Sequence, residues 1–389
     1  MNVVFDVLDD DAIENVITCL NFQIDKVVFF GDKETVKRNK KRTENFLLNK
    51  CFVTQVEFYC VDSENLDMIM SCIEQAIDTE CYENDRLFFD LTGGEGLLYI
   101  SFGILASKRN LPMHHYDVFS NSLIELNNVG YSISTIVPVQ RIILDVEKYI
   151  KMQGGIIKMC AHKQTKDPYN PELMPYIHSL WNVAKKYSDI WNSFSTFLRN
   201  ELNNDDGLTV YANASRIISA VSNNKAINKP KILFDILDDL QNAGALENVI
   251  HKNAKVSFKY KNQDIKECLF DGGCILELHT FVCENRVSDY CQVGVHLDWD
   301  GVLHTPQSAV KDVVNEIDVL SMTNNIPHFI SCKSGNLTSG QAMDAMYELS
   351  SVARRFGGKY VKMSLAVSKS LRDVDIERAN EMGISIYYY

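Results

Sequence analysis

The sequence predicts an α/β protein that consists of more than one domain. β-rich runs alternate with helical patterns over the first 145 residues, helical stripes dominate the middle, and a hairpin pattern followed by a helix and a strand closes the chain. A length of 389 residues suits two or three domains, and a hydrophobic content of 46% is enough for each to bury a core. We expect domains at residues 1–148, 149–268 and 269–389.

The first domain is predicted to be Rossmann-like. Its β-rich runs lie at residues 3–8, 26–30, 53–60, 86–91, 113–118 and 122–126, and helical patterns separate the first four from one another and from the fifth. Repeated β-α units predict a doubly wound parallel sheet, in which ligands bind beyond the carboxyl ends of the strands. The expected ligand loops are therefore residues 9–11, 31–35 and 92–96.

The third of these loops is rich in glycine. Glycines let backbone amides approach a phosphate or a sugar, and the helix N-terminus that follows favours an anion. The loop is neither a Walker A nor a GxGxxG motif, and a tight strand-to-helix turn is the alternative interpretation. The candidate ligand-binding residues are Asp9, Asp32, Lys33, Thr35, Thr92, Gly93, Gly94, Glu95 and Gly96.

The middle domain carries a helical stripe at residues 231–242 that ends before Gly244, then two alternating runs at 255–260 and 264–270. We expect the two runs to form a β-hairpin around residues 261–263. Helices followed by a hairpin predict a winged-helix-like linker. This linker either transmits conformational changes between the other two domains or binds DNA itself.

Composition restricts the partners. A net charge of -12 argues against broad, non-specific wrapping of nucleic acid, so any contact with it must use local Lys/Arg patches or metal ions. Eleven cysteines without a CxxC pair argue against structural zinc. The N-terminus has no basic leader, and no apolar run approaches the ~18 residues of a membrane span, which predicts a reduced, cytoplasmic protein.

The C-terminal domain contains the residues with catalytic potential. Two alternating runs flank Asn324-Asn325, a pair that tolerates the positive φ angles of a two-residue hairpin turn. In that register Asp318 faces Ser331, and Glu316 faces Lys333, with all four side chains on one face. A helix that carries Glu277 precedes the hairpin and can reach the same place.

Carboxylates at this density bind hard divalent cations such as Mg²⁺ or Mn²⁺. The candidate metal ligands are Asp318, Glu277, Glu316 and the backbone carbonyl of Cys332. Lys333 would orient a bound water or stabilise charge in the transition state. A solvated hairpin face with a weak Glu–Lys pair is the alternative, but the opposite face is apolar and predicts a core sheet.

These patterns resemble known nucleases. An acid and a lysine on a hairpin, with an acidic residue on the preceding helix, resemble the PD-(D/E)xK restriction-endonuclease fold. More narrowly, residues 273–277, 315–320, 329–333, Arg354-Arg355 and 357–359 resemble the CARF-domain effector nucleases of type III CRISPR systems. The Thr92-Gly93-Gly94 turn resembles the ligand-binding turn of CARF domains, so the resemblance covers nearly the whole chain in the expected order.

The resemblance implies a CARF ligand-sensing domain, a winged-helix-like linker and a PD-(D/E)xK-like nuclease domain. It implies that Glu277, Asp318 and Lys333 are catalytic. It also implies a homodimer that binds a cyclic oligoadenylate, such as cyclic tetra-adenylate, and then cleaves DNA or RNA with Mn²⁺ or Mg²⁺ in antiviral defence.

Two positions depart from the family pattern. Ser331 stands where the acid of (D/E)-x-K falls, so either Glu316 or Glu277 supplies the missing oxygen or the site is weakened. Glu95-Gly96 replaces the Thr-Lys that often follows the glycines, which alters the phosphate-side chemistry. Ser331 supports an alternative function, a ligand-responsive DNA-binding regulator with a degenerate nuclease fold. A nucleotide-metabolising Rossmann enzyme is the third hypothesis, although residues 92–96 have no nucleophile or base constellation nearby.

Overall fold

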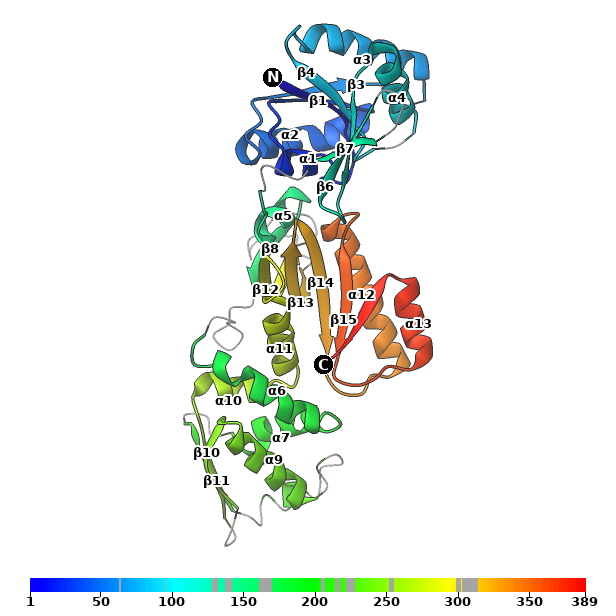
Figure 1. Cartoon of the computed structure of the whole chain (residues 1–389). Helices are drawn as coiled ribbons and strands as arrows, with labels where there is room; N and C mark the ends of the chain where they lie inside the picture. The colour runs from blue at the N-terminus through cyan, green and yellow to red at the C-terminus, as the bar shows by residue number, and fades with distance from the viewer. Residues whose placement is uncertain are drawn as a thin grey trace. The chain divides into compact units, whose positions relative to one another are not determined.

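Figure 1 shows the computed structural model of the chain, which describes all residues except 63, 95, 128–131, 137–141, 161–169, 204–206, 214–216, 218, 222–226, 228, 252–254, 299–301 and 303–313. The chain forms two compact units. The first comprises Met1–Leu144, Lys148–Gly154 and Gly358–Tyr360, and the second comprises Asp145–Glu147, Gly155–Gly357 and Val361–Tyr389. The finer division into three domains stays a prediction.

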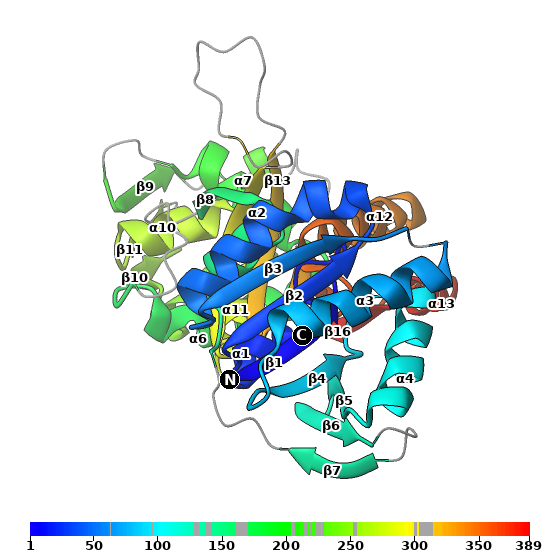
Figure 2. The ribbon, with the colours of Figure 1, turned by 90° about the horizontal axis from the view of Figure 1, so that it is seen from above.

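The first unit is built on a seven-stranded sheet in the order β3-β2-β1-β4-β5-β6-β7 (Figure 2). Its strands are β1 (Asn2–Val7), β2 (Lys26–Gly31), β3 (Gln55–Cys60), β4 (Arg86–Asp90), β5 (Met113–Asp117), β6 (Ser122–Leu126) and β7 (Ser132–Ile136). Its helices are α1 (Ile17–Asn21), α2 (Lys33–Lys50), α3 (Leu66–Glu80), α4 (Leu97–Arg109) and most of α5 (Val146–Met152). The first five strands pair in parallel and the last two antiparallel, which confirms the predicted α/β class.

Aromatic side chains attach α4 to the sheet of this unit. Phe89 of β4 stacks on Phe102 of α4 with ring centroids 4.6 Å apart, and Phe5 of β1 lies 6.0 Å from Phe89. All three side chains are fully buried. Rings of this size contribute most of the apolar area in such a core. The turn between β4 and α4 is therefore held at both ends.

The second unit contains a six-stranded sheet in the order β16-β15-β14-β13-β12-β8. Its strands are β8 (Ile156–Cys160), β12 (Tyr290–Asp298), β13 (Val314–Thr323), β14 (Ile326–Lys333), β15 (Lys362–Val367) and β16 (Ile384–Tyr388). The accompanying helices are α11 (Cys274–Glu284), α12 (Ser339–Gly357) and α13 (Asp373–Glu381). Strands β12 and β8 were not expected from the sequence, and β8 places a segment from before the helical region at the edge of this sheet.

The remaining part of the second unit combines helices with a three-stranded sheet in the order β10-β11-β9. Its elements are the short 3₁₀ helix η2 (Met174–Tyr176), α6 (Ile177–Lys186), α7 (Trp191–Glu201), β9 (Thr209–Asn213), α9 (Pro230–Asn242), β10 (Leu246–Ile250), β11 (Lys255–Tyr260) and α10 (Gln263–Phe270). The expected hairpin between residues 255–260 and 264–270 is wrong, because the second run is helix α10. Asn262 caps this helix through the Ile265 amide, and β11 pairs with β10 and β9 instead.

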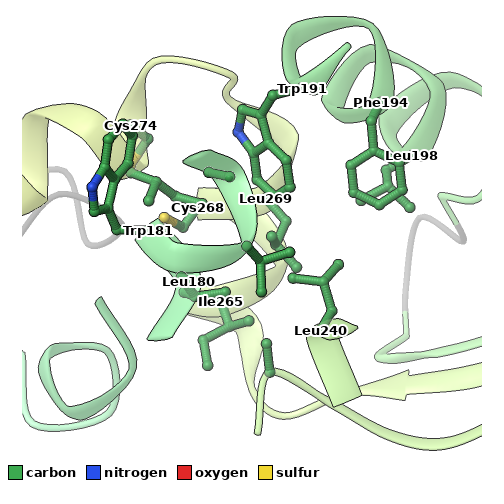
Figure 3. Close-up of a cluster of buried hydrophobic side chains, with 14 of the residues drawn as sticks. Leu180, Trp181, Trp191, Phe194, Leu198, Leu240, Ile265, Cys268, Leu269 and Cys274 are labelled. Carbon is green, nitrogen blue, oxygen red and sulfur yellow. The ribbon is translucent and has the colours of Figure 1, made fainter. Parts of the chain in front are cut away.

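A continuous apolar core joins the helices of the second unit to its larger sheet. Figure 3 shows part of it, with Leu180, Trp181, Trp191, Phe194, Leu198, Leu240, Ile265, Cys268, Leu269 and Cys274. Helix α11 packs against α6 on one side and against β12, β13 and β14 on the other. Glu277 lies in the first turn of α11 and is buried. Among the described residues, no helix combines the length and the apolar character needed to cross a membrane.

Candidate active site and ligand loops

The predicted hairpin of the C-terminal domain is present in the structure. Asn324 and Asn325 have φ angles of 54° and 64°, as a two-residue turn of this kind requires. Strand β13 pairs with β14 from Thr323↔Ile326 to Val319↔Ile330, which is the expected register. One step further along, the Ser331 hydroxyl donates to Asp318 Oδ2 at 3.2 Å. The structure therefore brings Asp318 opposite Ser331.

Asp318 carries a carboxylate that is held from the neighbouring strand. The Cys332 amide donates to its Oδ2 atom at 2.6 Å. Burial raises the pKa of Asp318 above its ordinary value, although this amide and the nearby charge of Lys333 act in the opposite direction. A desolvated carboxylate of this kind is stabilised as an anion when further positive charge approaches it.

Glu277 and Lys333 both act electrostatically on Cys332, whose amide holds Asp318. Glu277 is buried on α11. Burial raises the pKa of the Cys332 thiol, the negative charges of Asp318 and Glu277 raise it further, and Lys333 lowers it. All three predicted catalytic groups therefore lie within electrostatic range of one side chain at the end of β14.

Glu316, the fourth predicted group, has a different partner. It pairs in register with His296 of β12, and its Oε1 atom lies 3.7 Å from His296 Nε2. Its side chain is exposed, whereas Glu277 is buried. The sequence prediction missed His296 because it did not recognise strand β12. The alternation of Cys291, Val293 and Val295 as buried residues is the signal that marks this strand.

The donor set near Asp318 suits a hard cation that keeps several of its waters. Among the described residues, no three His, Cys, Asp or Glu side chains form a group that could hold a metal ion. The available donors are the carboxylates of Asp318 and Glu277 and the backbone carbonyl of Cys332. Mg²⁺ is often bound through one or two carboxylates with water in the other positions, and the raised pKa of Asp318 is the imbalance that a cation would offset.

The predicted ligand loops of the first unit lie at the carboxyl ends of β1, β2 and β4. Asp9 joins the first loop to the third, because its Oδ2 atom accepts a hydrogen bond from the Gly94 amide at 3.2 Å. Asn15 fixes Asp9 in turn, since its Oδ1 atom accepts from the Asp9 amide at 2.7 Å and its Nδ2 donates to the Asp9 carbonyl at 2.8 Å. Sequence reasoning did not single out Asn15.

Two glycines of the third loop are required by close packing. A Cβ atom on Gly93 would lie 2.6 Å from Glu14 Cβ, and one on Gly94 would lie 2.4 Å from Val7 Cβ. Gly94 also has a φ angle of 98°, which side chains other than glycine rarely adopt. Gly96, at the N-terminus of α4, has a φ angle of 68° with open space around it. Glu95 lies outside the described residues.

Several predicted ligand residues have structural partners of their own. The buried Thr92 hydroxyl donates to Asp90 and accepts from the Tyr116 amide at 2.9 Å. Asp32 caps α2 by accepting from the Glu34 and Thr35 amides, and the Thr35 hydroxyl donates to it at 2.7 Å. Lys33 is exposed at the same helix end. These side chains shape the loops, and Lys33 alone among them extends into solvent.

Buried acids lie beneath the loops. Asp6 of β1 and Asp90 of β4 are almost inaccessible to solvent. Burial raises the pKa of both carboxyl groups, and the neighbouring Asp90 raises that of Asp6 further. Hydrogen bonds that Thr92 donates to Asp90 act in the opposite direction and lower its pKa.

The comparisons with known proteins agree with this arrangement. Residues 266–388, in the C-terminal region, match the family model described as the Card1-like endonuclease domain. No curated protein matches the chain. The resemblance to CARF-domain effector nucleases that the sequence motifs predict is confirmed by this match and by the folds of known structures.

Two solved structures share the fold of nearly the whole chain. Protein VC1899 from Vibrio cholerae is 18% identical, with a TM-score of 0.69 over 100% of this chain and 94% of its own. Can2 from Sulfobacillus thermosulfidooxidans, solved in complex with cyclic tetra-adenylate, is 16% identical, with a TM-score of 0.60 over 99% of this chain and 95% of its own. The order of a Rossmann-like unit, a helical region and an α/β unit is therefore common to all three.

Proposed function

We propose that this protein is an endonuclease of CRISPR antiviral defence that requires a divalent metal ion and is activated by a cyclic oligoadenylate. The observation that carries the proposal is the partly buried Asp318 carboxylate on the hairpin, with Lys333 and Glu277 nearby, inside the region that matches a nuclease domain. The substrate is DNA or RNA, as single strands or as duplex DNA that is nicked. We propose a cytoplasmic location.

In the proposed mechanism the carboxylates of Asp318 and Glu277 and the backbone carbonyl of Cys332 would hold Mn²⁺ or Mg²⁺. When bound, such an ion polarises a phosphate and lowers the pKa of its water. The Cys332 amide and the Ser331 hydroxyl keep the Asp318 carboxylate oriented toward the site. Lys333 stabilises the charge that develops on the phosphate oxygens. Glu316 acts through its negative charge, which raises the pKa of Asp318, while its Oε1 atom lies 3.7 Å from His296 Nε2.

We propose that the activating ligand binds at the loops of residues 9–11, 31–35 and 92–96. The cyclic tetra-adenylate in the Can2 structure supports this choice of ligand class. Gly96 at the N-terminus of α4 has open space around it, so backbone amides at this helix end can approach a phosphate. Lys33 is the exposed cation at the neighbouring helix end. We further propose a homodimer in which ligand binding shifts the nuclease domains toward activity.

The first test is cleavage by active-site variants. We expect the wild-type protein to cut plasmid or single-stranded DNA or RNA in the presence of Mn²⁺ and cyclic tetra-adenylate. Asp318→Asn and Lys333→Met should each lower the rate by about 10²-fold or more, because each removes charge that stabilises the transition state. Binding of cyclic tetra-adenylate, measured by calorimetry, should be unchanged.

Matched controls are available on the same domain. Asp344→Asn on α12 and Lys362→Met on β15 replace exposed residues of the same types away from Asp318, and both should cut like the wild type. Addition of EDTA should stop cleavage in every active variant. Cutting at the wild-type rate by both active-site variants would exclude the proposed mechanism. Ligand-dependent DNA binding without any cleavage would instead support the regulator that Ser331 suggests.

A further inference from the structure

A groove on the first unit lies between the C-terminal half of α2 and helix α5. Its volume is about 550 Å³. It is lined by Arg42, Asn45, Phe46, Asn49, Lys50, Lys148, Lys151 and Met152. The lining belongs entirely to residues of the first unit.

The lining residues recur at helical spacing. On α2 they fall at positions 42, 45, 46, 49 and 50, and on α5 at 148, 151 and 152, so each set forms one stripe along its helix. Facing stripes of two neighbouring helices are normally apolar and close-packed. Here the stripes are mostly polar and line a groove between the two helices.

Every charged residue in the lining is a cation. Arg42, Lys50, Lys148 and Lys151 supply the charge, whereas the whole protein has a net charge of -12. Four cations around one concave surface concentrate positive potential and attract an anion. This groove is therefore a local basic patch of the kind that an acidic protein needs in order to contact nucleic acid.

Two further features suit a polynucleotide strand. Arg42 is oriented in advance, because its Nη2 atom donates to Asn39 Oδ1 at 2.8 Å and the buried Asn39 donates to Asp10 Oδ1 at 2.9 Å. Phe46 is half-buried between the cations along the same stripe and offers a ring against which a base can stack. The exposed Asn45 amide can donate to phosphate or base oxygens, and Asn49 Nδ2 donates to the Asn45 carbonyl at 2.7 Å, which leaves one N–H of its amide for a ligand.

We propose that this groove binds a short stretch of single-stranded nucleic acid through its phosphates, outside the cleavage site. Its size is in the range of small-ligand pockets and is too small for a duplex. It is also separate from the ligand loops, because its α2 residues lie about 10–20 Å along the helix from Thr35. The inference rests on the proposed function only in taking nucleic acid as the substrate class.

The test measures binding of a fluorescein-labelled single-stranded 20-mer, as DNA and as RNA, by anisotropy in EDTA, so that cleavage does not interfere. Lys50→Ala/Lys148→Ala/Lys151→Ala should bind at least about 10-fold more weakly than the wild type at low salt. The slope of log K against log salt should fall by about 2, since each lost phosphate contact removes about 0.7 for a single strand. Phe46→Leu should weaken binding severalfold with no change in slope.

The control variant is Lys37→Ala/Lys108→Ala/Arg109→Ala, which removes the same charge from exposed positions outside the groove. It should bind like the wild type. Equal weakening by both triple variants would show an effect of net charge alone and would overturn the proposal. Tighter binding of the corresponding duplex than of the single strand would overturn it too.

The proposed function and this inference can fail independently. Asp318→Asn should keep the groove-dependent binding, because its substitution lies in the nuclease domain. Groove-dependent binding by a protein that never cleaves would retain the inference and reject the proposed function. If the wild-type protein cleaves but the triple variant of the groove binds nucleic acid as well as the control variant does, the proposed function is retained and the inference is rejected.

Discussion

A serine hydroxyl lies beside the Asp318 carboxylate at the position where the resembled nuclease motif carries an acid. Ser331 donates to Asp318 Oδ2 at 3.2 Å and therefore stabilises the ionised form, which burial disfavours. A serine oxygen is a poor ligand for Mg²⁺, but a hydroxyl donor next to a carboxylate ligand fixes its orientation. Ser331 thus orients the Asp318 carboxylate, and we propose that it does so without serving as a metal ligand.

Ser331→Asp tests whether a cation binds at this position. Without metal, a second carboxylate opposite Asp318 adds repulsion, so the melting temperature in EDTA should fall. With Mn²⁺ both carboxylates become ligands, and we expect Mn²⁺ affinity by calorimetry to rise about 10-fold, which corresponds to about 1.4 kcal/mol. Ser331→Ala, which adds no charge, should show no such gain. If Mn²⁺ stabilises Ser331→Asp no more than the wild type, Asp318 does not bind the ion.

At the scale of elements, the turn from β4 to α4 depends on its glycines for two different reasons. Gly94 combines a positive φ angle with backbone packed against Val7, and Gly96 has a positive φ angle with nothing within 4 Å of its missing Cβ. Sequence reasoning interpreted both as giving access to a ligand. The structure shows that Gly94 is also needed for the turn to fit against β1.

Gly94→Ala and Gly96→Ala separate strain from packing. Gly96→Ala should cost about 1 kcal/mol of unfolding free energy, since only the backbone conformation is unfavourable. Gly94→Ala should cost about 2–4 kcal/mol, because its Cβ also meets Val7. Urea unfolding followed by far-ultraviolet circular dichroism measures both. Equal losses for the two variants would mean that the turn adjusts freely and that packing against Val7 is unimportant.

At the scale of the whole molecule, each unit has its own core and buries a histidine in it. His114 of the first unit stacks on Phe88 with ring centroids 3.9 Å apart, and His279 of the second stacks on Trp181 at 5.2 Å. Burial lowers the pKa of His114 to about 4, helped by the charge of Arg86, and burial lowers that of His279 to about 4 as well. Both rings are therefore neutral in the folded protein at pH 7.

Because of these two histidines, the folded protein becomes less stable as the pH falls. The unfolded chain binds the proton below about pH 6.5 and the folded chain only below about pH 4, so stability falls as pH decreases through that window. For His279 the loss from pH 7 to pH 5 is up to about 2 kcal/mol. Urea unfolding of the second unit, followed by tryptophan fluorescence of Trp181 and Trp191, measures it.

The variant His279→Gln should show a smaller pH dependence of stability, because the glutamine side chain does not titrate. His296→Gln, on β12 of the same unit, replaces a histidine outside the core and serves as the matched control. The control should keep the wild-type pH dependence. An unchanged loss of stability in His279→Gln between pH 7 and pH 5 would show that the buried ring does not carry the effect.

Local patterns in the sequence determined the parallel sheet, the Asn324-Asn325 hairpin and the opposition of Asp318 and Ser331, because side-chain period and turn chemistry act over a few residues. Tertiary structure decided the features that the periodicity of apolar residues does not determine. Residues 264–270 became a helix, because Asn262 caps it and Ile265, Cys268 and Leu269 are buried in the core. Pairing of distant strands placed His296 beside Glu316, and the fold of the first unit placed α2 and α5 on the two sides of one groove. Neither arrangement follows from local sequence, because the segments are far apart along the chain.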